Sequence, residues 1–373
     1  MTRSKFCFFG NISGALTGNT VGGGELQVAL LAKALALKGH EVVIIDPYAK
    51  ESFTSPEGVK LIKIENWNKG IRGVRFILHR VPALYKILDE QNADYYYIRM
   101  RSFFHLIPYL VAKKNKAIFI QAIASDIDVI GFWNQIKYEI RTNSNIFKLF
   151  MVNVPSYIVS NYLLLKSDYI FLQHKGQIMT GNHIKGKMMI FPNIIENKVN
   201  QLLKSFHQDY FIHVGTLTIY KGAENLYNLI SILDKNIKVI IVGVPDDNKS
   251  EIIFNRLKDF SNVILKGRMD HQSTIQLIAN AQALINTSNY EGFPNIFLEA
   301  WASGVPVISL KVNPGNVLNQ NSLGICCEGD LNRMKNCIET YETISIDHSK
   351  LISYVNDYHD FDSAIDRLAS IIQ

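Results

Sequence analysis

Short apolar segments alternate with helical segments along nearly the whole chain, and this alternation constrains the fold more than any other feature. Apolar strands that are separated by helices form parallel sheets with both faces covered. A first series of strands is predicted at Phe6–Phe9, Glu41–Asp46, Tyr95–Ile98, Ala117–Ile120, Tyr169–Leu172 and Met188–Phe191. A second series is predicted at Phe211–Val214, Val239–Val242, Val263–Lys266, Ala283–Asn286 and Val307–Ser309. The fold class is therefore α/β.

The two series are separated near Pro192–Gln208, which predicts two doubly wound, Rossmann-like domains. A chain of 373 residues is long for one core and suits two domains, 1–195 and 196–353. Helices are predicted at Glu25–Leu37 and over Tyr354–Gln373. Ligands of such sheets bind beyond the carboxyl ends of the strands. Two domains that face each other would bring these ends into one cleft.

Cysteine usage and hydropathy indicate the compartment. The four cysteines show neither C-x-x-C spacing nor a disulfide framework, which suits a reducing, cytoplasmic environment. The apolar segment near the N-terminus is too short for a signal peptide. The longest uncharged run, Leu149–Leu165, contains Asn153, Pro155 and Asn161, and is a poor membrane span.

Charge is distributed unevenly between the predicted domains. Residues 1–195 have 24 Lys and Arg against 13 Asp and Glu, a net +11, while residues 196–373 have 15 against 20, a net −5. A basic half could face anionic lipid, nucleic acid or an anionic acceptor. Trp133, Phe147 and Phe150 are interleaved with Lys137 and other basic residues, which favours docking on an anionic membrane. Those aromatic residues could equally be core.

Two glutamates, Glu291 and Glu299, stand eight residues apart. We expect a loop over Tyr290–Asn295 that runs into a helix over Pro294–Ser303. Proline suits the first helical position. The N–H groups at a helix start favour an anion such as phosphate. Carboxylates beside an anion site suit a ligand that also has hydroxyls. A nucleotide-diphosphate sugar has both, although an acidic loop that caps an ordinary helix is the alternative.

This stretch resembles the E-x7-E signature of retaining glycosyltransferases of family 4, which have the GT-B fold. Gly292-Phe293-Pro294 after the first glutamate and Ala300 after the second complete the match. The resemblance implies that Glu299 binds ribose hydroxyls and Glu291 the hexose. It also implies that Gly292 and the amides of Phe293, Asn295 and Ile296 border the donor, and that the last helix crosses back to the N-terminal domain.

A glycine run, Gly22-Gly23-Gly24-Glu25, opens the first long helix and resembles the start of a family 4 enzyme. There, Gly23 and Gly24 would line the donor phosphates, because glycine lets a ligand approach the backbone closely. A dinucleotide-binding fold is the competing interpretation. The chain lacks G-x-G-x-x-G spacing after the first strand, although Asp46 ends the second strand. A purely structural turn is a further alternative.

The segment from His213 to Gly222 resembles the family's strand–loop–lysine motif. The resemblance implies that Gly215 contributes to donor binding and that Lys221 binds the diphosphate, where a cation neutralises the leaving group. An arginine commonly follows the first glycine, but this chain has Thr216. Either one phosphate contact is missing or Arg268 supplies it. A solvated loop lysine is the alternative for Lys221.

Ser125, Asp126 and Asp128 follow the fourth predicted strand, where many relatives have a histidine that touches the donor hexose. We expect Asp126 to contact substrate, with a helix cap as the alternative. Asp126-Ile127-Asp128 is also a D-x-D, the metal signature of the other common glycosyltransferase fold. Two residues make a weak signal, and we expect no metal site. His174 and His183 have no ligand-spaced partners, and we expect surface or core roles.

Together these features predict a metal-independent, retaining hexosyltransferase that needs no cofactor beyond its nucleotide-sugar donor. The expected acceptor is a glycan or lipid-linked glycan of bacterial surface polysaccharide synthesis, at the inner face of the membrane, and no nucleic-acid partner is expected. Predicted catalytic residues are Glu291, Lys221 and Asp126. Predicted donor-binding residues are Glu299, Gly292, Phe293, Asn295, Ile296, Gly23, Gly24, Gly215, Thr216 and Arg268. Alternatives are an inactive sugar-nucleotide-binding assembly partner and a GT-B epimerase or phosphorylase.

Overall fold

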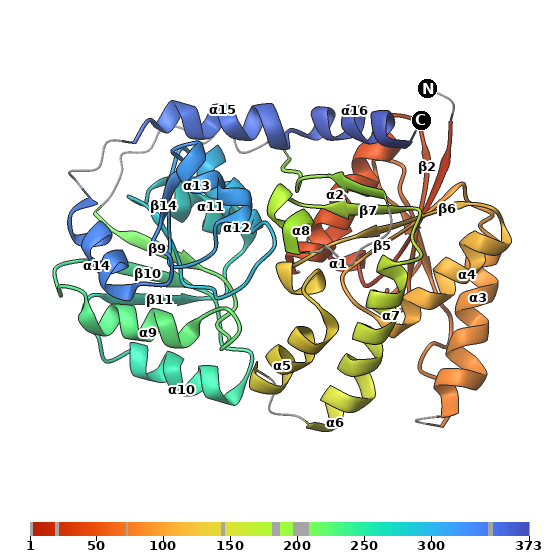
Figure 1. Ribbon diagram of the computed structural model, residues 1–373, viewed down its shortest axis with the longest axis horizontal. Coiled ribbons are helices and arrows are strands. Elements are labelled where there is room, and N and C mark those ends of the chain that lie inside the picture. Colours follow the sequence, from red (N-terminus) through yellow and green to blue (C-terminus); the bar gives the residue numbers. More distant parts are fainter. Residues whose placement is uncertain are drawn as a thin grey trace. The chain divides into compact units, whose positions relative to one another are not determined.

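A computed structural model describes residues 3–18, 22–71, 74–142, 146–180, 187–196, 209–341 and 346–372. The chain divides into two compact units (Figure 1). The first unit comprises Met1–Ile194 together with Phe361–Gln373, and the second comprises Ile195–Asp360. No helix among the described residues combines the length and the apolar character that crossing a bilayer requires. All four cysteines lie in described segments as free thiols.

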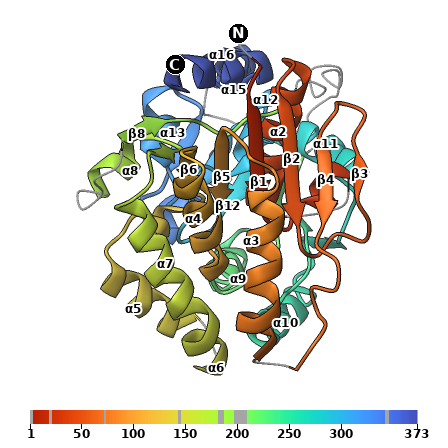
Figure 2. The ribbon, with the colours of Figure 1, turned by 90° about the vertical axis from the view of Figure 1, so that its right-hand side faces the viewer.

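The first unit is built on a twisted sheet of strand order β3-β4-β2-β1-β5-β6-β7-β8 (Figure 2). Neighbouring strands are parallel except for the antiparallel edge pair β3–β4. The strands are β1 (Lys5–Phe9), β2 (Glu41–Asp46), β3 (Phe53–Thr54), β4 (Lys60–Lys63), β5 (Tyr95–Arg99), β6 (Ile118–Ala122), β7 (Tyr169–Leu172) and β8 (Lys187–Ile190). All six predicted strands of the first series are present. β3 and β4 were not predicted, because they are short and only half of their residues are apolar.

Helices connect these strands and cover the sheet. They are α1 (Ser13–Leu16), α2 (Gly23–Leu37), α3 (Val81–Asp89), α4 (Leu106–Lys114), α5 (Phe132–Thr142), α6 (Ile146–Lys148), α7 (Val154–Leu164) and α8 (Lys175–Thr180). Short helical turns are η1 (Phe76–Arg80), η2 (Phe103–His105), η3 (Asp126–Asp128) and η4 (Leu149–Asn153). The helix predicted from Glu25 therefore starts two residues earlier, at Gly23.

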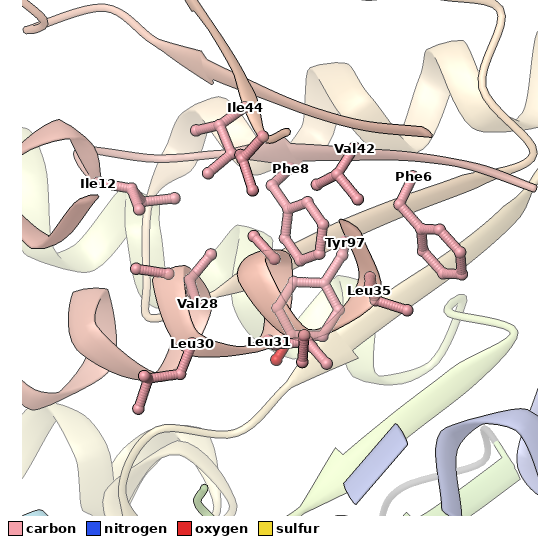
Figure 3. Close-up of a cluster of buried hydrophobic side chains, with 14 of the residues drawn as sticks. Phe6, Phe8, Ile12, Val28, Leu30, Leu31, Leu35, Val42, Ile44 and Tyr97 are labelled. Carbon is pink, nitrogen blue, oxygen red and sulfur yellow. The ribbon is translucent and has the colours of Figure 1, made fainter. Parts of the chain in front are cut away.

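The central strand β1 is apolar throughout because it is buried on both faces. Phe6 and Phe8 pack against Leu31 and Leu35 of α2 in the cluster of Figure 3. Cys7 and Phe9 point to the opposite face, in a second cluster with side chains of α3 and α4. Two-sided burial of this kind explains why the strand reads as a continuous apolar run.

The end of the chain differs from the single helix predicted over Tyr354–Gln373. It forms two helices, α15 (His348–His359) and α16 (Phe361–Ile372), which are separated by Asp360 in an extended conformation. α15 packs against α12 of the second unit, whereas Ile365 and Leu368 of α16 join the core of the first unit beside α2. The chain thus returns to the first unit, as the family resemblance implies, but the return begins at Phe361.

The second unit has a sheet of strand order β11-β10-β9-β12-β13-β14, and all its neighbouring strands are parallel. The strands are β9 (Phe211–Val214), β10 (Val239–Val242), β11 (Val263–Gly267), β12 (Leu284–Asn286), β13 (Val307–Ser309) and β14 (Gly324–Cys326). The helices are α9 (Ala223–Ile232), α10 (Asn248–Leu257), α11 (His271–Ala279), α12 (Asn295–Ala302), α13 (Val317–Gln320) and α14 (Leu331–Glu339), with the turn η6 (Pro314–Asn316). Each unit is therefore a Rossmann-like α/β fold.

Candidate functional site

The strand order of the second unit reverses between β9 and β12, which lie side by side in the sheet. Loops at such a switch point diverge at the carboxyl ends of the strands and leave room for a ligand. The loop after β9 carries Lys221, and the loop after β12 carries Glu291. Buried His213 of β9 joins the two strands, with Nδ1 3.2 Å from the carbonyl oxygen of Ile285, and burial lowers its pKa to about 4.

Side chains of these two loops meet across the switch point. The ammonium nitrogen of Lys221 lies 3.9 Å from Oε1 of Glu291. The Ser288 hydroxyl lies 3.2 Å from the same carboxylate oxygen and 3.4 Å from the carbonyl oxygen of Lys221. Lys221 is 41% exposed and Glu291 21% exposed, so both remain accessible to a ligand. The structure thus brings these two predicted catalytic residues together.

The backbones of the two loops approach each other at Gly222. This residue has φ +73°, and a Cβ built on it would lie 1.9 Å from the carbonyl oxygen of Thr287. The Thr287 hydroxyl donates to the Gly222 carbonyl oxygen at 3.1 Å, and the Asn225 side chain donates to the Thr287 carbonyl oxygen at 3.1 Å. Only glycine fits this conformation and this contact, and its position determines where Lys221 lies.

A second close approach positions Gly215 and Thr216. Gly243, in the loop after β10, has φ +142°, and a Cβ built on it would lie 1.9 Å from the carbonyl oxygen of Gly215. Thr216 is exposed beside this contact. Arg268 is also exposed, in the loop after β11, which is separated from β9 by β10. The prediction that Arg268 supplies the phosphate contact of the family's arginine stays a prediction.

The helix that holds Glu299 is α12, and it begins one residue later than predicted. Pro294 is the N-cap, with ψ 126°, and not the first helical residue, while Ser303 is the C-cap. Phe293 is buried against Trp301 and His359, so its side chain anchors the loop. Its predicted contribution to donor binding, like those of Gly292, Asn295 and Ile296, is through the backbone and stays a prediction.

Glu299 has a partner that the sequence did not reveal. Its Oε1 lies 3.2 Å from Nε2 of His271, the first residue of α11. The Glu299 side chain is 12% exposed, whereas that of His271 is 67% exposed. The hydrogen bond to Glu299 raises the pKa of His271 above its ordinary value, against an opposing effect of desolvation. The carboxylate predicted to bind ribose is therefore already oriented by a histidine.

This pair predicts a pH-dependent contribution to stability. Because the folded-state pKa of His271 is raised, its charged form stabilises the fold below the unfolded pKa of about 6.5, and the effect is lost as pH rises through the folded pKa. We expect His271→Ala to lower the unfolding midpoint at pH 5.5 and to match the wild type at pH 9. Thermal unfolding at both pH values measures this. A deficit of the same size at both values would show that the charge of His271 has no role.

In the first unit, Asp128 has a structural role. Its Oδ2 accepts hydrogen bonds from the backbone N–H groups of Ser125 and Ala124, at 2.9 and 3.1 Å. Its Oδ1 pairs with Nε of Arg101 at 3.0 Å. Ser125 is the N-cap of η3, and Asp128 completes a capping box. The described residues include no group of three His, Cys, Asp or Glu side chains that could hold a metal ion.

Asp126 points to different partners and is 38% exposed. Its Oδ1 accepts from Nε2 of Gln177 at 2.9 Å and lies 3.0 Å from Nε2 of His174. His174 is buried, as one predicted alternative had it, but it is paired with a carboxylate that lies 48 residues away in sequence. The cap in this turn is Ser125, so the cap alternative for Asp126 is wrong. Its contact with substrate stays a prediction.

The glycine run shows a packing role for one of its residues. A Cβ on Gly24 would lie 2.8 Å from Cγ of Met100, so glycine lets α2 pack against the loop after β5. Gly22 is the N-cap of α2, and Gly23 is its first residue. Residues 19–21 lie outside the described segments. Phosphate binding by Gly23 and Gly24 stays a prediction.

Asp46 argues against the dinucleotide-binding interpretation. It is fully buried at the end of β2, and its carboxylate accepts from the backbone N–H groups of Ile12, Ser13 and Tyr48, each at 2.8 Å. A carboxylate engaged in this way holds the loop after β1 and is not available to a ribose.

Comparison with known proteins supports this description. Residues 194–355 match the family model "Glycosyl transferases group 1". An uncharacterized glycosyltransferase of Methanocaldococcus jannaschii is 30% identical over 152 residues, a match that spans 36% of this chain and 37% of that protein.

Two solved structures resemble the whole chain. Sucrose-phosphate synthase of Thermosynechococcus elongatus has a TM-score of 0.76 at 15% identity, over 99% of this chain and 98% of that one. The Anabaena protein HepE, in complex with UDP and glucose, has a TM-score of 0.70 at 14% identity, over 99% of both chains. The chain thus has the GT-B fold throughout, and its second unit carries the sequence pattern of the group 1 glycosyl transferases.

Proposed function

We propose that this protein is a retaining glycosyltransferase that moves a hexose from a nucleotide-diphosphate sugar to a hydroxyl acceptor. The observation that carries the proposal is the convergence of Lys221 and Glu291 at the switch point of the second unit, 3.9 Å apart. Glu299 follows on α12, which begins directly after the Glu291 loop. One cation and two carboxylates suit a ligand that combines phosphates with sugar hydroxyls.

Each group has a proposed task. Lys221 binds the diphosphate, Glu291 the hexose hydroxyls and Glu299 the ribose hydroxyls. Since HepE forms a complex with UDP and glucose on the same fold, a uridine nucleotide sugar is the first donor to try. Gly215, Thr216, Arg268 and the glycine start of α2 are the further proposed donor contacts. Asp126 of the first unit, held by Gln177 and His174, is the proposed sugar contact there.

The proposed reaction occurs on one face of the sugar. The bond from the anomeric carbon to the diphosphate oxygen breaks, and the bond to the acceptor oxygen forms on the same face. The acceptor proton passes to the leaving phosphate. The protein then contributes positioning and charge stabilisation, with Lys221 neutralising the phosphate as negative charge develops. A glycan or a lipid-linked glycan is the proposed acceptor, in the cytoplasm.

A donor screen tests the proposal. Purified protein is incubated with UDP-, GDP- and ADP-sugars in excess EDTA, and nucleoside diphosphate release is measured with and without hydroxyl acceptors. We expect release from one donor class, undiminished by EDTA, because Lys221 and helix N–H groups carry out the task of a divalent ion. Release that EDTA abolishes and Mn²⁺ restores would contradict the metal-independent mechanism. Tight binding of a donor without turnover would favour the inactive binding protein.

Glu299→Ala is expected to weaken donor affinity. Hydrogen bonds to a charged group contribute about 1.5–3 kcal/mol, which corresponds to a roughly tenfold to hundredfold loss. Isothermal titration calorimetry with the donor found in the screen measures the change. Glu251→Ala, at an exposed position of α10, is the matched control and should bind normally. Unchanged affinity in a folded Glu299→Ala protein would disprove the assignment of Glu299 to the donor.

A further inference from the structure

Large apolar side chains are exposed on the α5–α6 segment of the first unit. Trp133 and Ile140 of α5 are 74% and 58% exposed. Phe147 of α6 and Phe150 and Met151 of η4 are 72%, 61% and 60% exposed. We call these five residues, with Lys137 and Lys148 among them, the α5–α6 surface. Monomeric proteins in water seldom expose so many large apolar side chains together, and such patches mark interaction sites.

Helix α5 is joined to the fold by polar contacts with α7, so the exposure of Trp133 and Ile140 does not reflect a detached helix. In the connection from β6 to β7, α5 is joined to α7 through the Asn161 side chain, which donates to Oε1 of Gln135 at 2.7 Å. The Tyr157 hydroxyl donates to Oε2 of Glu139 at 2.9 Å. Because η3 with Asp126 and then α5 follow the carboxyl end of β6, the segment starts at the end of the sheet where Asp126 lies.

The charges of this segment are almost all of one sign. Residues 129–166 contain four basic residues, Lys137, Arg141, Lys148 and Lys166, and one acidic residue, Glu139. Glu139 is half-buried, and its carboxylate accepts hydrogen bonds from Tyr157 and Asn153. Lys137 and Lys148 are exposed, and in sequence Lys137 follows Trp133 by one helical turn and Lys148 follows Phe147 directly. A partner must therefore accept aromatic side chains and offer negative charge.

We propose that the α5–α6 surface docks on a bilayer that contains anionic lipid. Aromatic side chains enter the interface between headgroups and acyl chains, and lysines pair with lipid phosphates. A second copy of the chain fits less well, since a twofold interface would set this basic surface against itself. If the proposed function holds, docking would keep the first unit close to a lipid-linked acceptor, but the docking itself does not depend on that function.

Tryptophan fluorescence gives a selective readout of this docking. The chain has three tryptophans, and Trp67 and Trp301 are 3% and 0% exposed, whereas Trp133 is 74% exposed. Titration with phosphatidylcholine vesicles containing 30% phosphatidylglycerol, without donor or acceptor, should shift the emission to shorter wavelength and protect Trp133 from acrylamide. Vesicles of phosphatidylcholine alone should produce a much weaker response. An equal response to both vesicle types would contradict the proposal that docking depends on anionic lipid.

Variants test the two components separately, with sedimentation of the same vesicles as the measurement. Lys137→Glu with Lys148→Glu should weaken binding at least tenfold, since each basic residue near an anionic surface contributes about fivefold. Phe147→Ser with Phe150→Ser should also weaken it tenfold or more, while Trp133 remains as the reporter. Ile252→Ser with Tyr358→Ser, at positions 56% and 54% exposed in the second unit, is the matched control and should bind normally.

Three outcomes would overturn the proposal. The first is wild-type vesicle binding by both α5–α6 variants with unchanged unfolding midpoints. The second is no anionic-vesicle response by the wild type. The third is a wild-type dimer in light scattering that Phe147→Ser with Phe150→Ser converts to a monomer, which would assign the surface to self-association. A wild-type protein that binds anionic vesicles but turns over no nucleotide sugar would contradict only the proposed function.

Discussion

Lys221→Ala is expected to lower kcat/KM for glycosyl transfer by about 10²–10³-fold, the loss typical when one preorganised group that stabilises developing negative charge is removed. The side chain is 41% exposed and its one described ion pair, to Glu291, is long at 3.9 Å. The substitution should therefore leave the fold intact. Initial rates at several donor concentrations, with the circular dichroism spectrum as a check on folding, measure the effect.

Two further variants make this result specific. Lys249→Ala, at an exposed position of α10, removes a lysine from the same unit and should retain full activity. Lys221→Arg keeps the charge and should recover part of the rate, because the guanidinium also binds phosphate but differs in reach. A folded Lys221→Ala enzyme with less than a threefold deficit would remove Lys221 from the mechanism and leave it as a solvated loop lysine.

Gly222→Ala is expected to destabilise the second unit by at least about 3 kcal/mol. A left-handed conformation costs a residue with a Cβ about 1–2 kcal/mol, and the new Cβ would also lie 1.9 Å from the Thr287 carbonyl oxygen. That carbonyl belongs to backbone at the switch point, where the Asn225 side chain donates to it and the hydroxyl of buried Thr287 donates to the Gly222 carbonyl oxygen. The loops that carry Lys221 and Glu291 must then separate. Thermal unfolding of the full chain measures the loss.

Two other glycines separate the causes of this effect. Gly39 has φ +89°, and a Cβ added there would meet no described atom within 4 Å, so Gly39→Ala should show only the conformational cost of about 1–2 kcal/mol. Gly131 lacks both features, and Gly131→Ala should lie within about 0.5 kcal/mol of the wild type. If Gly222→Ala loses no more stability than Gly39→Ala, the close contact with Thr287 adds no cost. The two loops would then be able to move apart without destabilising the unit.

The sequence alone predicted the elements whose signal is local. Strands such as β9 and β10 are apolar because both faces are buried, and their bounds agree with the prediction residue for residue. The Glu291–Glu299 spacing placed one carboxylate before a helix and one within it. Even the small error at Pro294 is local, since proline fits the N-cap and the first turn almost equally well. Each of these features depends on residues within one element.

Pairings between distant segments could not be predicted in this way. His271 meets Glu299 across 28 residues because helices α11 and α12 pack together, and His174 meets Asp126 across 48 because the neighbouring strands β6 and β7 end at the same side of their sheet. The structural role of Asp128 could not be predicted either. A D-x-D pattern does not indicate that one of its carboxylates will cap a turn and pair with Arg101. Strand order decides these contacts, and strand order is a property of the assembled sheet.

Exposure is the other quantity that only the tertiary structure decided. The pattern of Trp133, Phe147 and Phe150 fitted both a core and a membrane-facing surface, because an amphipathic helix shows which side is apolar but not what covers it. In the fold, α5 and α7 join through polar contacts from Gln135 and Glu139, and the aromatic side chains point outward. Local sequence determines the elements and their apolar faces, whereas packing determines which of those faces remain exposed.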